Sequence, residues 1–334
     1  MVAVSRPPSN NNVFRFRSCK PATLYEGIPV VDLSDPDAKY LIVKASQDLG
    51  FFKIVNHGVP MELINTLGNE AQTFFGKPQS DKDRAGPPDP FGYGSKRIGW
   101  NGDFGWIEYL LLNFNPDVIS PNTLFVFNQF PQAFCSALEK YVSAVRELSY
   151  EVLELMADGL GIEERNAFSR LLRDEKSDCL FRLNHYPPCS ELEALSGKKL
   201  IGFGEHTDPQ LISVLRSNNT SGLQICLRDG TWVSVPSDHT SFFINVGDIL
   251  EVMTNGRFKS VKHRVLADPS RSRLSMIYFG GPPLSGKIGP LASVMGKEEE
   301  KLYKEFTWCE YKKALYKSRL GDNRLAPFQK AAGQ

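Results

Sequence analysis

The sequence predicts an α+β protein with a mainly β core: a jelly roll, or double-stranded β-helix, of two facing sheets braced by helices on one side. Eight short runs after Asp178 alternate apolar and polar residues with a period of two, which is typical of strands. Turn-forming pairs such as Asn218-Asn219 and Asn255-Gly256 separate these runs, as in an antiparallel barrel. From about Pro131 to Leu160 the apolar residues instead recur every three or four positions, which predicts a long amphipathic helix.

The N-terminal part is predicted to alternate strands and helices. An apolar run at residues 28–33 favours a strand, and the helical pattern that follows it stops at Gly50. Residues 51–55 favour a second strand, which leads into a helix from about Pro60 to Phe75. Residues 85–105 are rich in proline and glycine, so we expect no regular structure there. Long irregular segments in compact domains are commonly binding loops, and we interpret this one as a substrate loop.

The expected boundaries divide the chain into four regions. The eight strands are expected at residues 180–186, 201–206, 211–216, 223–227, 231–235, 242–246, 262–266 and 274–279, and a helical pattern returns at about 298–320. We therefore expect a flexible lead-in at 1–27, an α/β and helical region with the substrate loop at 28–175, a β-helix core at 176–285 and a C-terminal helical region at 286–334. No internal repeat and no linker between independent domains is apparent.

Composition narrows the class of protein. Hydrophobic residues make up 41% and charged residues 23% of the 334 positions, which is typical of a soluble globular protein. Because 39 basic residues nearly balance 38 acidic ones, no nucleic-acid partner is expected. No apolar run approaches the roughly 20 residues of a membrane span, so no membrane partner is expected either. The six cysteines form no CxxC pair, which argues against a zinc ribbon and favours reduced thiols in the cytoplasm. The sequence is compatible with a monomer or a homo-oligomer.

Three residues form a candidate metal site. His206 and Asp208 lie two positions apart, so on a strand they share one face, and His263 follows 55 residues after Asp208. Two imidazoles and one carboxylate on one side of a metal are the ligand set of non-haem Fe(II) oxygenases. An isolated histidine is more often structural or exposed, and an HxD pattern arises by chance. The prediction therefore depends on all three residues and their strand context together.

A candidate anion site follows the last histidine. Arg273 and Ser275 alternate on one face of a predicted strand, and a guanidinium group binds a carboxylate through two hydrogen bonds. Burial of this cation would be costly without an anion, which a dicarboxylic co-substrate such as 2-oxoglutarate supplies. Asn184 and Tyr186, again two apart, offer an amide and a phenol to the same molecule. The alternatives are a surface cation at Arg273 and a core tyrosine at Tyr186.

The other three histidines have no partner at a useful spacing. We interpret His57, His185 and His239 as structural.

Several motifs together resemble a known family. Residues 51–59 (FFKIVNHGV), 184–189 (NHYPPC), 204–208 (GEHTD), 245–248 (NVGD) and 273–275 (RLS) are similar to the plant 2-oxoglutarate- and iron-dependent dioxygenases. Residues 86–94 (GPPDPFGYG), 96–99 (KRIG), 105–109 (GWIEY) and 253–264 (MTNGRFKSVKHR) resemble the gibberellin 2-oxidases, in particular the subgroup that acts on nineteen-carbon gibberellins. The resemblance covers the chain from about residue 28 onward. His185 stands where the wider family usually has tyrosine, a change familiar in this subgroup.

The resemblance implies a fold, a reaction and a set of site residues. The family fold is the double-stranded β-helix. His206, Asp208 and His263 would hold Fe(II), and 2-oxoglutarate would bind with its distal carboxylate on Arg273 and Ser275, assisted by Tyr186. Dioxygen is the co-substrate, and ascorbate keeps the iron reduced. The implied reaction is 2β-hydroxylation of a gibberellin, coupled to decarboxylation of 2-oxoglutarate to succinate and CO2, which inactivates the hormone.

The substrate site is a separate hypothesis. A gibberellin is a compact apolar skeleton with a carboxylate, which calls for aromatic walls and one cation. We expect Arg97 to bind the carboxylate and Tyr93, Trp106 and Tyr109 to line the cavity, although Arg97 would also fit a solvated loop. Three rival functions remain: another oxygenase of small hydrophobic acids or flavonoids, an ethylene-forming oxidase without 2-oxoglutarate, and a metal-free hormone-binding barrel.

Overall fold

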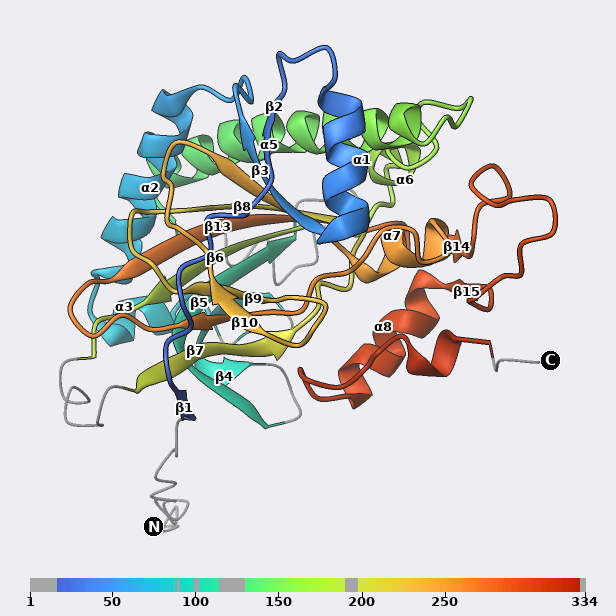
Figure 1. The fold of residues 1–334 in the computed structure, drawn as a ribbon. Coiled ribbons are helices and arrows are strands. Elements are labelled where there is room, and N and C mark those ends of the chain that lie inside the picture. The colour runs from blue at the N-terminus through green and yellow to red at the C-terminus, as the bar shows by residue number, and fades with distance from the viewer. Residues whose placement is uncertain are drawn as a thin grey trace, which may run out of the picture.

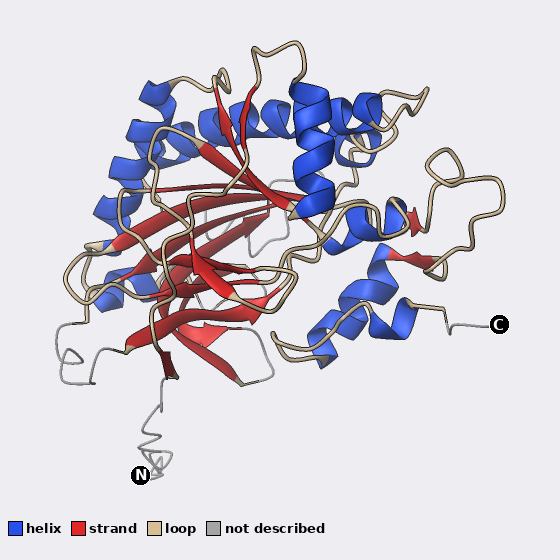
Figure 2. Cartoon of the chain, viewed as in Figure 1, coloured by secondary structure: helices blue, strands red, loops and turns tan. Residues whose placement is uncertain are grey.

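Two facing β-sheets form the centre of the computed structural model, and helices cover the outer side of one of them (Figures 1 and 2). The structure describes residues 17–86, 88, 91–98, 102–113, 130–189 and 198–330. In these residues no helix combines the length and the apolar character that crossing a bilayer requires.

The larger sheet has eight strands. Their order is β2 (Val30–Asp32), β3 (Phe51–Val55), β11 (Phe242–Val246), β8 (Ile212–Ser217), β13 (Arg273–Gly280), β6 (Leu180–Tyr186), β5 (Asp103–Asn113) and β4 (Gly92–Ile98). Neighbouring strands are antiparallel except β2 and β3, which are parallel. The N-terminal strands therefore extend the same sheet that carries the core strands.

The smaller sheet has five strands. Their order is β1 (Ser18–Cys19), β7 (Lys199–His206), β12 (His263–Leu266), β9 (Leu223–Cys226) and β10 (Trp232–Ser234), all antiparallel. A separate pair, β14 (Lys287–Ile288) and β15 (Phe306–Thr307), precedes the C-terminal helix. The strands predicted from the period-two pattern are therefore confirmed, with ends that shift by at most two residues.

The helices pack mainly against the larger sheet. They are α1 (Ala38–Asp48), α2 (Met61–Phe75), α3 (Gln79–Asp83), α5 (Gln132–Gly159), α6 (Arg170–Arg173), α7 (Asp248–Met253) and α8 (Trp308–Lys317), with a 3-10 turn at Ala326–Phe328. The long predicted helix is confirmed as α5, which lies with α1 and α2 on one side of the strands (Figure 1). The start of α8 is stabilised by a capping box, in which Thr307 accepts from the Glu310 amide and Glu310 accepts from the Thr307 amide.

Alternation along the strands creates two separate cores. On β6, Phe181 and Leu183 belong to the core between the larger sheet and the helices. Arg182, Asn184 and Tyr186 instead line a cavity between the two sheets. Because successive side chains of a strand point to opposite faces, one strand serves both layers. The inner layer of the barrel is where the polar residues of the candidate site gather.

Three expectations are corrected by the structure. Residues 85–105 were expected to be irregular, yet residues 92–98 and 103–105 belong to the antiparallel pair β4 and β5. Residues 87, 89–90 and 99–101 lie outside the described residues. Close packing explains the glycines here, since a Cβ on Gly94 would lie 2.5 Å from the Tyr109 ring and one on Gly105 2.0 Å from the Gly202 carbonyl oxygen.

The two chain ends account for the other corrections. The C-terminal helix is shorter than the predicted 298–320, because the chain first forms β15 and then starts α8 at Trp308. Part of the lead-in is also ordered: β1 pairs with β7, and Leu24 bridges Ser234. Residues 1–16 lie outside the described residues.

Candidate metal centre and co-substrate pocket

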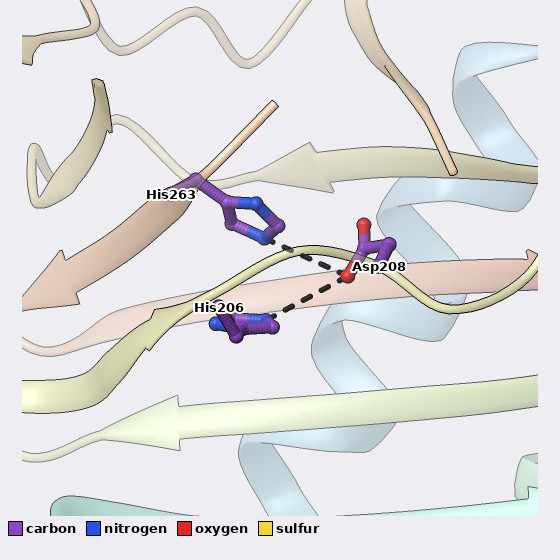
Figure 3. A group of neighbouring side chains, drawn as sticks. All are labelled: His206, Asp208 and His263. Atoms are coloured by element: carbon purple, nitrogen blue, oxygen red, sulfur yellow. Dashed lines mark ion pairs between the residues drawn. The ribbon is translucent and has the colours of Figure 1, made fainter. Parts of the chain in front are cut away.

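His206, Asp208 and His263 come together in the structure as the sequence predicts (Figure 3). His206 ends β7 and lies directly opposite His263, the first residue of β12, in the antiparallel register. Asp208 lies just past the end of β7 rather than on the strand. Its Oδ1 is 3.6 Å from His206 Nε2 and 3.7 Å from His263 Nε2. Three potential ligand atoms therefore lie within 4.8 Å of one another.

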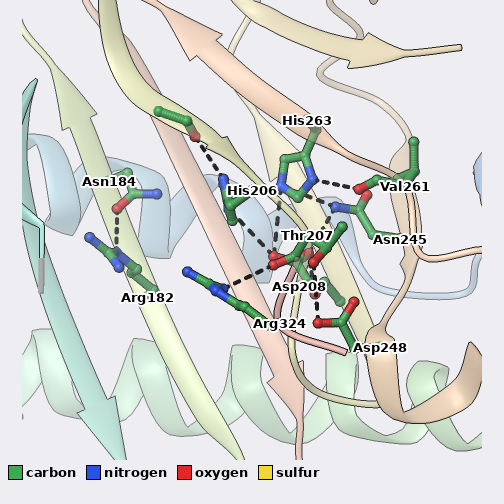
Figure 4. A network of polar contacts seen from close by, with 12 residues as sticks. Arg182, Asn184, His206, Thr207, Asp208, Asn245, Asp248, Val261, His263 and Arg324 are labelled. Atoms are coloured by element: carbon green, nitrogen blue, oxygen red, sulfur yellow. Dashed lines mark hydrogen bonds and ion pairs between the residues drawn. The ribbon is translucent and has the colours of Figure 1, made fainter. Parts of the chain in front are cut away.

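Backbone carbonyls orient both imidazoles. His206 Nδ1 is 2.8 Å from the Gly204 oxygen, and His263 Nδ1 is 3.2 Å from the Val261 oxygen (Figure 4). Because a carbonyl only accepts, each Nδ1 carries a proton, and Nε2 is the ring nitrogen that faces the other two residues. Burial, and then the nearby His263, lowers the pKa of His206 to about 3. His206 is therefore neutral at physiological pH, which is the form that ligates metals.

Asp208 is held so that one oxygen remains available. Its Oδ2 accepts hydrogen bonds from Ser213 Oγ at 2.6 Å and Asn245 Nδ2 at 2.9 Å. Burial alone would raise the pKa of Asp208, but His263, His206 and these two hydrogen bonds outweigh it and lower the pKa. The carboxylate is thus ionised, and Oδ1 faces the two imidazoles. Two imidazoles and one carboxylate fit the ligand set of a non-haem Fe(II) site.

The ligand loop is also tied to the C-terminal helix. Thr207 Oγ1 donates to Asp248 Oδ2 at 3.2 Å, and the Tyr311 hydroxyl of α8 donates to the same oxygen at 2.5 Å. Asp248 is buried at the start of α7. This network links the segment between His206 and Asp208 to α8, outside the barrel.

The predicted co-substrate residues line the same cavity as the metal ligands. Strands β13 and β6 pair with Arg273 opposite Tyr186 and Ser275 opposite Asn184, and all four side chains face the cavity. Arg273 is only 2% exposed, and its Nε has no hydrogen-bond partner among the described residues. Its guanidinium carbon lies 5.4 Å from the centre of the Tyr186 ring. A buried cation with an unpaired donor fits an external carboxylate.

The four predicted substrate residues have different surroundings in the structure. Tyr109 packs its ring 4.0 Å from the guanidinium carbon of Arg182, a cavity residue. Trp106 donates from Nε1 to the Pro187 carbonyl at 2.8 Å and packs with a small cluster at the edge of the barrel. Tyr109 therefore touches a cavity residue, and neither Tyr109 nor Trp106 is among the side chains that line the cavity.

Tyr93 and Arg97 are not among the side chains that line the cavity. The Tyr93 hydroxyl donates to Glu108 Oε2 at 2.6 Å, and its ring packs in the core between sheet and helices. Arg97 is exposed on β4. The alternation of β4 and its bulge between Ser95 and Arg97 set the directions of these side chains, and the sequence does not reveal the bulge. Substrate contacts by Tyr93 and Arg97 stay a prediction.

Sequence reasoning missed several residues of the site. Arg182 lines the cavity two positions before Asn184, so the alternation that identified Asn184 and Tyr186 already contained this signal. His185, interpreted as structural and without a partner, pairs its Nδ1 with Glu108 Oε1 at 2.7 Å. Asn245 and Ser213 hold Asp208, and no spacing rule links them to it in sequence.

Comparisons with known proteins agree with this geometry. Residues 177–282 match the model of the 2OG-Fe(II) oxygenase superfamily, and residues 28–133 match that of the non-haem dioxygenase in morphine synthesis N-terminal region. The chain is 70% identical to a gibberellin 2-beta-dioxygenase of Phaseolus coccineus, over 99% of both chains. It is 61% identical to gibberellin 2-beta-dioxygenase 2 of Arabidopsis thaliana, over 99% of this chain and 97% of the relative.

The chain belongs to the gibberellin 2-beta-dioxygenase family. It is therefore a dioxygenase that depends on Fe(II) and 2-oxoglutarate. Among solved structures, this gibberellin 2-beta-dioxygenase family member resembles JOX2 in complex with 2OG, Fe and JA. The TM-score is 0.80 and the identity 27%, over 93% of this chain and 91% of JOX2. The dioxygenase for auxin oxidation in rice has a TM-score of 0.73 at 23% identity, over 91% of this chain and 100% of that one, which supports the fold alone.

Proposed function

We propose that the chain is a gibberellin 2-beta-dioxygenase that inactivates gibberellins and their precursors by 2β-hydroxylation. The reaction consumes the gibberellin, 2-oxoglutarate and O2, and yields the 2β-hydroxylated gibberellin, succinate and CO2. The observation that carries the proposal is the combination of a complete His206, Asp208 and His263 site with near full-length identity of 59–70% to three gibberellin 2-beta-dioxygenases.

The cavity residues have distinct roles in this proposal. When bound, Fe(II) supplies the redox chemistry that couples O2 to oxidation of an unactivated C–H bond. His206, Asp208 and His263 would hold the metal. Arg273 and Ser275 bind the distal carboxylate of 2-oxoglutarate, and Tyr186 and Asn184 border the same molecule. Apolar walls, including Leu223, Val265 and Ile277, exclude water from the reacting atoms.

The test is a reconstitution under controlled oxygen. The protein is assembled anaerobically with Fe(II) and 2-oxoglutarate, exposed to O2 with ascorbate present, and offered several gibberellins, a flavonoid and other small hydrophobic acids. We expect one succinate for each 2β-hydroxylated gibberellin, detected by mass analysis. Preferred turnover of another acid or of a flavonoid would favour the alternative of a different plant 2-oxoglutarate-dependent oxygenase.

A non-catalytic barrel gives a different result. A hormone-binding protein would bind gibberellin but release no succinate, and Asp208→Ala would leave binding unchanged. We expect Asp208→Ala to abolish both iron binding and hydroxylation, whereas Asp229→Ala, in an exposed turn, serves as the control.

Organisation and surroundings complete the proposal. We propose that residues 28–175 support the barrel and the substrate side, that 176–285 form the catalytic core and that 286–334 cover it. The shared eight-stranded sheet supports a division into regions rather than into independent folding units.

A small molecule is the proposed partner, without nucleic acid or membrane, and the proposed location is the cytoplasm. Gel filtration tests for a homo-oligomer.

A further inference from the structure

Arg182 is a second cation in the cavity that holds the metal ligands. It lies on β6 with its side chain on the inner face, beside Asn184 and Tyr186. Its guanidinium carbon is 4.0 Å from the centre of the Tyr109 ring and 5.0 Å from that of Phe203. Two aromatic rings therefore hold the guanidinium group, which restricts its position without neutralising its charge.

The hydrogen bonds of Arg182 are incomplete. Its Nε donates to Asn184 Oδ1 at 2.7 Å (Figure 4), whereas its Nη2 is buried and has no partner among the described residues. Burial lowers the pKa of Arg182, and Tyr109, Tyr186 and Asp208 oppose that shift. The free edge of a fixed guanidinium group with an unpaired buried donor is suited to a carboxylate.

The net charge of the cavity with metal and co-substrate bound favours one more anion. The ionic side chains that line it are Arg182, Arg273 and Asp208, and an imidazole that ligates a metal does so in its neutral form. Both oxygens of Asp208 are already committed: Oδ2 accepts from Ser213 and Asn245, and Oδ1 faces the imidazoles. When Fe(II) and dianionic 2-oxoglutarate are counted with these groups, one positive charge remains, which a single carboxylate neutralises. Arg324 lies nearby but donates to the Thr207 carbonyl oxygen and is not a lining residue.

The two arginines occupy different places along the barrel. Arg273 lies opposite Tyr186 in the β6–β13 register, whereas Arg182 lies opposite Ile277, four residues further along. At about 3.3 Å per residue, their backbone positions differ by about 13 Å along the strands. Arg182 is next to Tyr109 on β5, on the side of the cavity that borders the β4–β5 hairpin. It is therefore placed for a second ligand rather than for the distal end of 2-oxoglutarate.

We propose that Arg182 binds the carboxylate of the organic substrate and makes the enzyme select free acids over esters. This inference rests on the proposed function for the identity of the acid, an apolar monocarboxylate such as a nineteen-carbon gibberellin. Asn184 fixes Nε, and Tyr109 and Phe203 fix the plane of the group, so that the remaining N–H donors face the acid. A lysine ammonium group does not reproduce the planar pair of donors with which arginine binds a carboxylate.

The test compares a nineteen-carbon gibberellin that has one free carboxylate with its methyl ester. Binding is measured by calorimetry on anaerobic protein loaded with Fe(II) and 2-oxoglutarate, for wild type, Arg182→Met, Arg182→Lys, Arg97→Met and the control Arg271→Met. Arg271 is an exposed arginine just before β13. Since a hydrogen bond to a charged group contributes about 1.5–3 kcal/mol, we expect wild type and the control to prefer the acid by about 10- to 100-fold.

The expected result is specific to Arg182. In Arg182→Met the acid-to-ester preference should fall close to one, and in Arg182→Lys it should be intermediate, while the Kd values for Fe(II) and 2-oxoglutarate stay within about twofold of wild type. Unchanged co-substrate binding also shows that the variant is folded.

Three results would overturn the inference. The first is a preference that survives in Arg182→Met. The second is an equal loss of affinity for 2-oxoglutarate, which would assign Arg182 to the co-substrate. The third is loss of the preference in Arg97→Met instead. Because calorimetry needs no turnover, wild type that binds the acid through Arg182 but does not hydroxylate it would refute the proposed function and leave this inference standing.

Discussion

His185 Nδ1 lies 2.7 Å from Glu108 Oε1, directly across the antiparallel pair of β6 and β5. The other carboxylate oxygen, Glu108 Oε2, accepts from Lys82 Nζ and from the Tyr93 hydroxyl, each at 2.6 Å. The His185 ring also stacks on the Phe75 ring of α2, with 5.2 Å between the ring centroids. This buried cluster lies on the helix side of β6, behind Asn184 and Tyr186, whose side chains face the cavity on the other side. Glu108 therefore positions the strand that carries two proposed co-substrate contacts.

Glu108→Gln should destabilise the protein. The change leaves Lys82, only 8% exposed, without its counter-charge, and breaking a buried pair on one side costs about 3–5 kcal/mol. Urea unfolding followed by circular dichroism measures the loss. The double variant Lys82→Met, Glu108→Gln should recover part of it, because no isolated charge remains. Equal stabilities of wild type and Glu108→Gln would show that the pair contributes nothing.

The same carboxylate should make stability depend on pH. Burial raises the pKa of Glu108, but the hydrogen bonds from His185, Lys82 and Tyr93 outweigh it, so the folded-state pKa is below the usual 4.5. A depressed pKa means that the unfolded state binds the proton more readily. The stabilisation is therefore present above pH 4.5 and is lost as the pH falls from 4.5 through the folded-state value.

The pH dependence is measured in each protein as the difference between the urea midpoints of unfolding at pH 6 and at pH 4. Wild type should lose more stability between pH 6 and pH 4 than Glu108→Gln, which has no group to titrate at this position. Parallel losses in the two proteins would assign the acid sensitivity to other carboxylates.

Asn245→Ala should weaken iron binding without removing a ligand. Asn245 Nδ2 donates to Asp208 Oδ2 at 2.9 Å and lies 3.5 Å from His263 Nε2, so it orients the carboxylate. Loss of such a supporting hydrogen bond typically costs 10- to 100-fold in metal affinity, and we expect about 10-fold here because Ser213 still holds Oδ2. Competition with a chelator measures the affinity. An unchanged iron affinity in a folded Asn245→Ala protein would rule out this role.

Arg273→Met should raise the KM for 2-oxoglutarate. The guanidinium group is buried, its Nε is unpaired, and the proposed ligand is a carboxylate that it binds through two hydrogen bonds. We expect an increase of about 10- to 100-fold, with a smaller increase for Arg273→Lys, because lysine keeps the charge and loses the fork. The KM is measured from the rate of succinate release at varied concentrations of 2-oxoglutarate. If instead the KM for gibberellin rose alone, the assignments of Arg273 and Arg182 would have to be exchanged.

Local patterns in the sequence predicted much of the fold and the site. The period-two runs located the core strands, and the same alternation placed Arg273 with Ser275 and Asn184 with Tyr186 on shared faces. The residue types and spacing of His206, Asp208 and His263 predicted a metal site, and in the structure these three residues lie together. The glycines of residues 85–105 were misread, because a glycine that admits a neighbouring strand has the same sequence signature as one in a loop.

By itself, then, the sequence determined which side chains share a face of each strand and which three residues have the chemistry to hold iron. Only the tertiary structure decided which face lines the cavity, that Arg182 lies inside it while Arg97 is exposed, and that Glu108 meets His185 behind it. The physical reason is that alternation is a property of one strand, whereas the direction of a face depends on the strands and helices that pack against it. Those partners are distant in sequence, and a single bulge such as that beside Lys96 changes which side chains they meet.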